Sequence, residues 1–213
     1  MKNSEITQEI GAQLAKKLEG FEFDSREKTL WRDTQKSSQR IQLTVVSTRV
    51  AGTKRMDASA SVRNRELAKL CHSNDSPWPD NARNWFWISI WCPSLISDFD
   101  RLVSFESTEK KLRRFIKDYT IALQKDVVPW LDRYSIMEEL FNGLTGDNYQ
   151  DWIVGNAQRL PVLLAIHAKR RDMDGFEKAA AEYAEYCDQP HITNMEREKS
   201  RIIVAELRRQ FEE

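Results

Sequence analysis

The chain has 213 residues, and its 33 basic and 33 acidic side chains give a formal net charge of zero. Such a balance argues against a globally basic nucleic-acid-binding protein and against an acidic mimic of DNA, while it leaves local charged patches open. The negative mean hydropathy and the lack of a long apolar run argue against a membrane span, so we expect a soluble protein with enough apolar residues for a core.

The N-terminal residues predict an amphipathic helix. Apolar side chains recur there at helical spacing: Ile6, Ile10, Leu14 and Leu18. Gly20 follows as a natural stop, because glycine readily adopts the left-handed backbone that commonly ends a helix. The apolar stripe of this helix needs a sheet to lie on.

Extended segments are predicted next. They fall at residues 21–23, 29–33 and 41–51, and the last is rich in β-branched residues. We expect the second and third segments to pair as a hairpin across a polar, turn-like connection. Residues 52–61 are small and polar, which predicts a loop or an irregular edge, and residues 62–70 show a short helical period.

Residues 84–92 predict a strand that needs cover on both faces. Successive side chains of a strand point to opposite faces, so three tryptophans share one face: Trp85, Trp87 and Trp91. The opposite face is apolar as well: Phe86, Ile88 and Ile90. Residues 73–81 hold Trp78 between two prolines, so they form the clearest predicted loop and lead into this strand.

The rest of the chain is mainly helical. A fourth strand is expected at residues 99–105, followed by a long helix at residues 108–128 that Pro129 ends. Ser135 and Glu138 have the spacing of a capping box, which predicts a short helix that stops near Gly143. Three further helices are predicted from residue 149 onward, at residues 161–171, 176–187 and 194–211.

Together these elements predict an α+β fold. Strands that are close in the sequence favour antiparallel pairing, so we expect a small, mostly antiparallel sheet of about 3–5 strands packed by helices. An all-helical C-terminal extension follows. The expected domains are residues 1–145, the α+β part, and residues 146–213, the helical extension packed on it.

Two resemblances arise from this pattern. Six features occur together in this chain. They are the opening helix, the step from Gly20 to Phe21, the Leu30-Trp31 strand, the Ile41 strand, the aromatic strand near Trp85 and the helix ending Val128-Pro129-Trp130-Leu131. In this combination about two thirds of the chain resembles a bacterial family of uncharacterised proteins, domain of unknown function 4304, which implies no catalytic residues. Residues 160–180 are similar to a single tetratricopeptide-like helical hairpin, without a repeat.

Nucleophilic and metal chemistry have little support. Cys71 and His72 are adjacent, so on a helix they point about 100° apart and do not easily form a nucleophile–base pair. His167 and His191 have no second ligand at metal-binding spacing, and for His167 a structural role is the favoured interpretation.

Acidic side chains give only weak signals. Asp98 and Asp100 would share a strand face, and the Glu109-Lys110-Lys111 run loosely matches an element of metal-dependent nucleases. Such short spacings arise often in a chain this rich in charge, so a solvated rim is the favoured interpretation. We therefore expect no catalytic residue, no metal and no cofactor.

Cysteine usage and the first residues suggest a compartment. Cys71, Cys92 and Cys187 are odd in number and widely spaced, which suits a reducing environment and neither a disulfide framework nor a zinc site. The first ten residues lack the apolar core of a secretory signal. We therefore expect a cytoplasmic protein.

A basic stripe is predicted along the helix at residues 108–128. Its members are Lys110, Arg113, Arg114 and Lys117. They lie opposite the apolar side of the helix and could hold phosphates or an acidic protein, although the ordinary outer face of an amphipathic helix is the favoured interpretation. Stacking of a single-stranded nucleic acid on the nearby tryptophans is disfavoured by the neutral overall charge.

The leading functional hypothesis is a non-enzymatic, cytoplasmic protein-interaction module, with an immunity-type antitoxin that occludes a partner protein as one form of it. Its predicted partner-binding residues are Trp85, Trp87, Trp91, Trp78, Lys110, Arg113, Arg114 and Lys117. Tryptophan and arginine concentrate binding energy at interfaces.

Three alternatives remain open. In the first, the C-terminal helices, and not a partner, cover the tryptophan face. In the second, the chain is a small-ligand binder or enzyme with a tryptophan-lined pocket under the 73–81 loop. In the third, nucleic acid binds the basic face of the 108–128 helix. The oligomeric state is left open.

Overall fold

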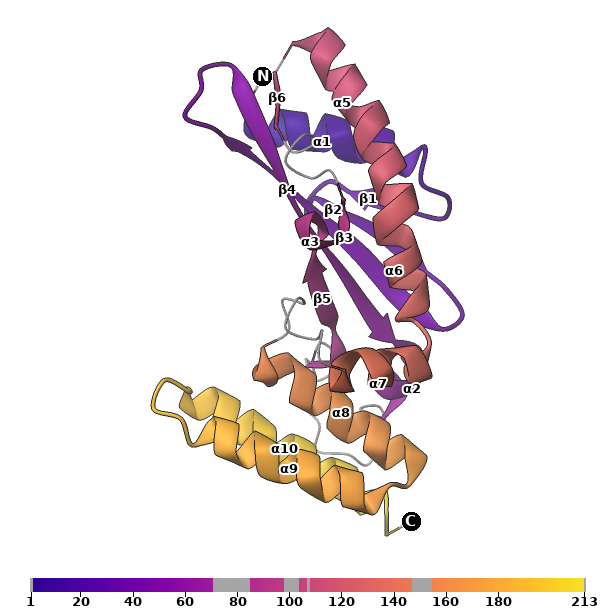
Figure 1. Ribbon diagram of the computed structural model, residues 1–213, viewed down its shortest axis with the longest axis vertical. Helices are drawn as coiled ribbons and strands as arrows, with labels where there is room; N and C mark the ends of the chain where they lie inside the picture. Colours follow the sequence, from indigo (N-terminus) through magenta and orange to yellow (C-terminus); the bar gives the residue numbers. More distant parts are fainter. Residues whose placement is uncertain (1, 71–84, 98–103, 107, 147–154, 213) are drawn as a thin grey trace. The chain divides into compact units, whose positions relative to one another are not determined.

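The computed structural model describes residues 2–70, 85–97, 104–106, 108–146 and 155–212 (Figure 1). Its contacts divide the chain into two units, Met1–Val62 with Ser89–Tyr134 and Arg63–Ile88 with Ser135–Glu213. This division differs from the expected boundary at residues 145 and 146, because residues 63–88 and 135–145 group with the C-terminal helices. The predicted loop at residues 73–81, with Trp78, lies outside the described residues.

The first unit is built on an antiparallel sheet. Its strands are β1 (Glu22–Asp24), β2 (Thr29–Asp33), β3 (Ser37–Ser47), β4 (Thr53–Asn64), β5 (Ile88–Trp91) and β6 (Ser104–Glu106). The order is β1-β2-β3-β4-β5, and β6 pairs with β4 (Figure 1). The predicted hairpin is confirmed, since β2 and β3 pair antiparallel with Leu30 opposite Ile41. The α+β class with a helical C-terminal region is confirmed as well.

Helix α1 (Asn3–Ala15) packs on the sheet as predicted. Ile6, Ile10 and Leu14 are fully buried, and the helix contacts β1, β2 and β3. The chain then leaves the helical region through Gly20, whose φ of +75° is the left-handed conformation that glycine adopts without strain. The predicted amphipathic helix is therefore confirmed, but it ends at Ala15 with Lys16 as its C-cap, and Gly20 turns the chain toward β1 only afterwards.

A second helical segment covers the same face of the sheet. It consists of α5 (Glu109–Ala122), the π-helical turn η2 (Leu123–Val127) and α6 (Val128–Arg133). Phe115 of α5 stacks on Phe105 of β6, with ring centroids 4.3 Å apart, and α5 also contacts α1. The short helix α3 (Cys92–Leu95) follows β5 and contacts η2.

The prediction that Pro129 ends the long helix is wrong. The chain stays helical to Arg133, with Pro129 in the first turn of α6. Proline lacks the amide that would donate four residues back, and its ring crowds that carbonyl. The π-helical turn immediately before it lets the Val128 amide bond to the Leu123 carbonyl, and the helix continues past the proline.

Two strand predictions also change. Residues 52–61 were expected to form a loop or irregular edge, but β4 runs from Thr53 to Asn64. The apolar residues Met56, Ala58, Ala60 and Val62 share its buried face and alternate with polar residues. The tryptophan strand is shorter than expected, since Trp85 and Phe86 form a 3-10 turn and β5 begins at Ile88. The described part of the segment expected as a strand at 99–105 belongs to β6.

The second unit contains five helices within the described residues. They are α2 (Arg65–Lys69), α7 (Met137–Thr145), α8 (Asn156–Arg170), α9 (Met173–Cys187) and α10 (Asn194–Arg209). Helix α8 is buried on all sides from Arg159 to Ala168 and contacts the other four. A helix that is apolar all round belongs in the interior, so α8 is the centre of this unit.

Two helix starts in this unit differ from the prediction. Helix α8 begins before Pro161, and the carbonyl of Ala157, which a proline amide cannot reach, accepts a hydrogen bond from Lys199 Nζ at 3.4 Å. The expected capping box of Ser135 and Glu138 is absent, because α7 is capped by Ile136 without a side-chain bond. The Ser135 carbonyl instead accepts from Asn64 Nδ2 at 2.9 Å.

Candidate interaction surface

Alternation along the central strands separates a buried from an exposed face of the sheet. In β3, Ile41, Leu43 and Val45 are buried, while Gln42 and Thr44 between them are exposed. In β5, Ile90 is buried and Trp91 is 46% exposed. We call the exposed side the open sheet face. Its residues are Trp31, Arg40, Gln42, Thr44, Ser61, Ser89 and Trp91. Of these, Gln42, Thr44 and Trp91 are exposed, Trp31, Arg40 and Ser89 are partly exposed, and Ser61 is buried.

The open sheet face is polar but carries two tryptophans. On β2 and β3, Trp31 lies opposite Arg40, whose guanidinium is 6.0 Å from the indole centroid. On β4 and β5, the hydroxyls of Ser61 and Ser89 are hydrogen-bonded at 2.9 Å. Trp91 follows Ser89 on the same side of β5 because side chains alternate. Amphipathic aromatic side chains on a polar, charge-poor surface are typical of protein interfaces.

Trp85 and Trp87 precede β5 and are not part of the open sheet face as defined above. Trp87 is 6% exposed, with the guanidinium of Arg63 5.0 Å from its ring centroid. Trp85 is partly exposed and lies 5.5 Å from the ammonium of Lys199 on α10. The expected strand is therefore shorter at its start, because Trp85 lies in a 3-10 turn and Trp87 directly precedes β5. Of the three tryptophans, only Trp91 lies within the strand, and its side chain is the most exposed of the three.

The predicted basic stripe lies on the outer side of α5. Lys110, Arg113, Arg114 and Lys117 are all exposed, and the buried residues Leu112, Phe115 and Ile116 lie on the opposite side. Arg113 pairs with Glu109 at 2.5 Å and Arg114 with Asp118 at 3.6 Å, each one turn away. Exposed ion pairs one helical turn apart contribute only about 0.3–0.5 kcal/mol to stability. Because the pairs are this weak, another anion can compete for the two arginines.

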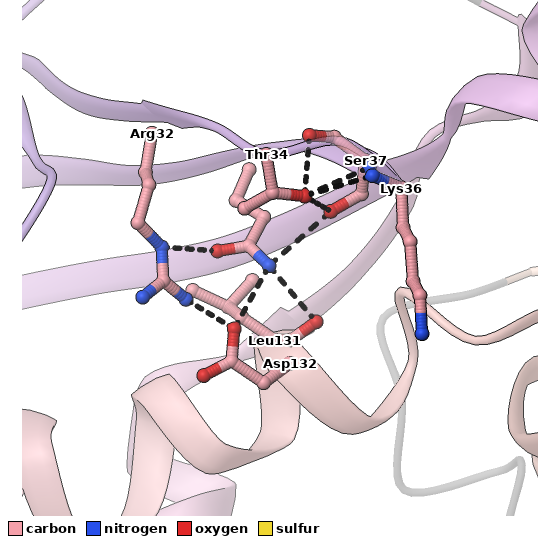
Figure 2. A network of polar contacts seen from close by, with 7 residues as sticks. Arg32, Thr34, Lys36, Ser37, Leu131 and Asp132 are labelled. Carbon is pink, nitrogen blue, oxygen red and sulfur yellow. Dashed lines mark hydrogen bonds and ion pairs between the residues drawn. The ribbon is translucent and has the colours of Figure 1, made fainter.

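A polar network fixes α6 to the β2–β3 hairpin (Figure 2). Gln39 is fully buried; its Oε1 accepts from Arg32 Nε at 2.7 Å, and its Nε2 donates to the Leu131 carbonyl at 3.2 Å. Asp132 accepts from both Gln39 and Arg32. Across the turn, Thr34 Oγ1 accepts from the Ser37 amide at 3.0 Å and so closes the hairpin (Figure 2).

This network positions the sheet and is not a ligand site. Arg32 is also sandwiched against Phe21, whose ring centroid is 4.6 Å from the guanidinium. Its side chain is only 15% exposed, and its charge is matched by Asp132. Sequence analysis missed the network because its members are about a hundred residues apart and share no local spacing. Its signal in the sequence is a polar Gln39 that directly continues the alternating apolar positions Ile41, Leu43 and Val45.

His167 has a structural environment at the turn between α8 and α9. Its Nδ1 lies 2.7 Å from Asp172 Oδ2, and Phe141 packs edge-on against the ring. The Gly175 amide donates to Asp172 at 3.0 Å, and this bond, followed by the one to His167, lowers the pKa of Asp172. A Cβ on Gly175 would lie 2.3 Å from the imidazole, so glycine is required at this contact.

The thiols and hydroxyls in the core are shielded from reaction. Cys92 and Cys187 are buried with free thiols, and burial raises the pKa of Cys92 to about 12. Burial also raises the pKa of Tyr119, whose hydroxyl makes no hydrogen bond within the described residues. In the same residues, no group of three or more His, Cys, Asp or Glu side chains could hold a metal ion.

The described helices also bear on the membrane question. None of those within the described ranges combines the length and the apolar character needed to cross a bilayer.

A shallow groove of about 460 Å³ lies between α9 and α10, and small side chains such as Ala181, Ala184 and Ala205 form part of its lining. Nothing in its lining indicates an occupant.

Comparisons with protein-family models, curated protein sequences and solved structures find no match for this chain. The resemblances to domain of unknown function 4304 and to a tetratricopeptide-like hairpin therefore stay predictions.

Proposed function

We propose that the protein is a non-enzymatic protein-interaction module whose open sheet face contacts a partner protein. The observation that carries this proposal is Trp91, a large aromatic side chain that is 46% exposed on β5, whereas Ile88 and Ile90 on the opposite face of the same strand are buried. Burying such a side chain on binding removes substantial apolar area from water, which makes tryptophan a frequent centre of interface energy.

Two further features support a protein partner. Gln42 and Thr44 offer hydrogen-bonding groups that an approaching surface can satisfy, and the Arg40–Trp31 pair presents a planar cation beside an aromatic ring. The polar network around Gln39 holds the neighbouring strands rigidly from the other side of the sheet. A rigid face loses little entropy on binding.

Site-specific photo-crosslinking in the native cell tests this proposal. A photoreactive amino acid at Thr44 is expected to capture a discrete protein partner, whereas the same group at Met195, 77% exposed on α10, is not. Adding Trp91→Ala should abolish the Thr44 adduct, with Met195→Ala as the matched control. Equal adducts at the two positions, or a Thr44 adduct that persists with Trp91→Ala, would contradict the proposal.

The immunity-type antitoxin is the narrower form of this proposal, in which the open sheet face covers the working surface of a toxin. Co-expression with the product of the adjacent gene tests this form. Growth should be arrested by that product alone and restored by the wild-type chain, and Trp91→Ala should lose the protection. An adjacent product that is harmless to the cell would contradict it.

A further inference from the structure

Helix α5 carries a concentrated positive charge in a chain that is neutral as a whole. Its 14 residues hold five basic side chains, Lys110, Lys111, Arg113, Arg114 and Lys117, against two acidic ones, Glu109 and Asp118. In contrast, the formal net charge of the full chain is zero. The side chains of Arg113 and Arg114 are 77% and 76% exposed, so their guanidinium groups face solvent.

The stripe continues past Lys117 in two ways. Ile121, one turn further along the same helix face, is 53% exposed although it is apolar. Gln124, the next turn on, donates to the Lys17 carbonyl at 3.0 Å and brings the exposed end of α1, with Lys16 and Lys17, beside the stripe. The basic face of α5 is therefore a row of cations that ends at an exposed apolar side chain, Ile121.

We propose that the basic face of α5 binds an acidic amphipathic protein segment, with carboxylates along Lys110, Arg113, Arg114 and Lys117 and an apolar side chain on Ile121. Charge complementarity favours an anionic partner, because exposed arginines offer several donors to carboxylates. Glu109 and Asp118 lie beside the stripe and would repel carboxylates and phosphates alike, so they do not distinguish the two kinds of partner. The exposed isoleucine does distinguish them, because an apolar contact suits a protein segment better than a nucleic-acid backbone.

Binding of defined probes to the full chain tests this proposal. The probes are a fluorescent 20-residue helical peptide with glutamates on one face and leucines on the other, a scrambled peptide of the same composition, and a 20-nucleotide oligothymidine, measured by anisotropy. The charge-reversal variant is Arg113→Glu with Lys117→Glu. Its matched control is Arg171→Glu with Lys178→Glu, two exposed positions in the second unit.

We expect the amphipathic peptide to bind more tightly than the scrambled one, and α5 charge reversal to weaken it about tenfold or more, since like charges across an interface cost several kcal/mol. Ile121→Asp should weaken it as well, whereas the control pair and Trp91→Ala should not. Circular dichroism checks that each variant is folded. Tighter binding of the oligothymidine, equal binding of both peptides, or no effect of charge reversal would overturn the proposal.

Because Trp91 belongs to a different surface, this test stands apart from that of the open sheet face. Loss of the peptide with α5 charge reversal and its retention with Trp91→Ala would support the α5 site even if the Thr44 crosslink fails. A Thr44 adduct without peptide binding would support the open sheet face and overturn the α5 site.

Discussion

Gly11 shows how one missing side chain fixes the position of a helix. It lies in α1, where glycine is ordinarily the poorer choice because alanine is more favourable by about 1 kcal/mol. A Cβ at this position would lie 2.2 Å from the ring of Phe23 on β1. Real Cβ atoms do not approach so closely, so the glycine allows α1 to seat against the edge of the sheet.

We predict that Gly11→Ala destabilises the protein by about 1 kcal/mol despite its better helix propensity, because forcing extra atoms into a packed site costs about 1–3 kcal/mol. In a Phe23→Ala background the sign should reverse, and the alanine should then stabilise. Urea denaturation of the four proteins in this cycle measures both effects. A stabilising Gly11→Ala in the wild-type background would show that the Phe23 ring moves aside at little cost.

At the scale of elements, the polar network around Gln39 decides how α6 is held. Gln39 is fully buried, whereas the side chain of Asp132 is 54% exposed. A buried polar group that loses its partner has no water to replace it, so the two residues should contribute unequally.

We therefore predict that Gln39→Leu destabilises the protein by about 2–3 kcal/mol, because it removes the buried hydrogen bonds that Gln39 makes to the Leu131 carbonyl and to Arg32 Nε. Asp132→Asn should cost less than about 1 kcal/mol, because that side chain keeps its shape and reaches solvent. Thermal and urea unfolding provide the comparison. The reverse ranking would mean that the ion pair with Arg32, rather than Gln39, holds the helix.

The sequence predicted elements wherever periodicity and residue size agreed. The stripe from Ile6 to Leu18 and the β-branched run after Ile41 are large and regular, and both are confirmed. Strand β4 was missed because Ala58 and Ala60 fill the buried positions with small groups, which weakens the apolar signal although the alternation is present. Pro129 was misjudged because a π-helical turn, set by tertiary packing, has no local signature.

The candidate surface was only partly predictable for a related reason. Trp91 was named from its strand position, and the hairpin of β2 and β3 was predicted, but no local pattern places β4 between that hairpin and β5. Trp85 and Trp87 looked equivalent to Trp91 in the sequence. They differ because the strand begins only at Ile88, so that Arg63 and Lys199 cover their rings.

At the scale of the whole molecule, buried acidic groups link stability to pH. Burial raises the pKa of Cys92 from 9.0 to about 12, and it also raises the pKa of Tyr119 and Tyr183 above 10.0. In the unfolded chain these groups ionise near their ordinary values. Between pH 9 and 12 the unfolded state therefore binds fewer protons than the folded state, and unfolding becomes more favourable as the pH rises.

We predict that the contribution of these groups to the free energy of unfolding is constant below about pH 9. Above that pH the free energy of unfolding should fall by up to about 1.4 kcal/mol per pH unit for each group. Urea midpoints at successive pH values from neutral to strongly alkaline measure the slope. Tyr119→Phe isolates one contribution: its hydroxyl makes no hydrogen bond within the described residues, so the variant should be as stable as the wild type at neutral pH and should lose less stability in alkali. Parallel profiles for the two proteins would show that folding does not raise the pKa of Tyr119. A variant clearly less stable at neutral pH would show that the hydroxyl has a hydrogen-bond partner in the folded state.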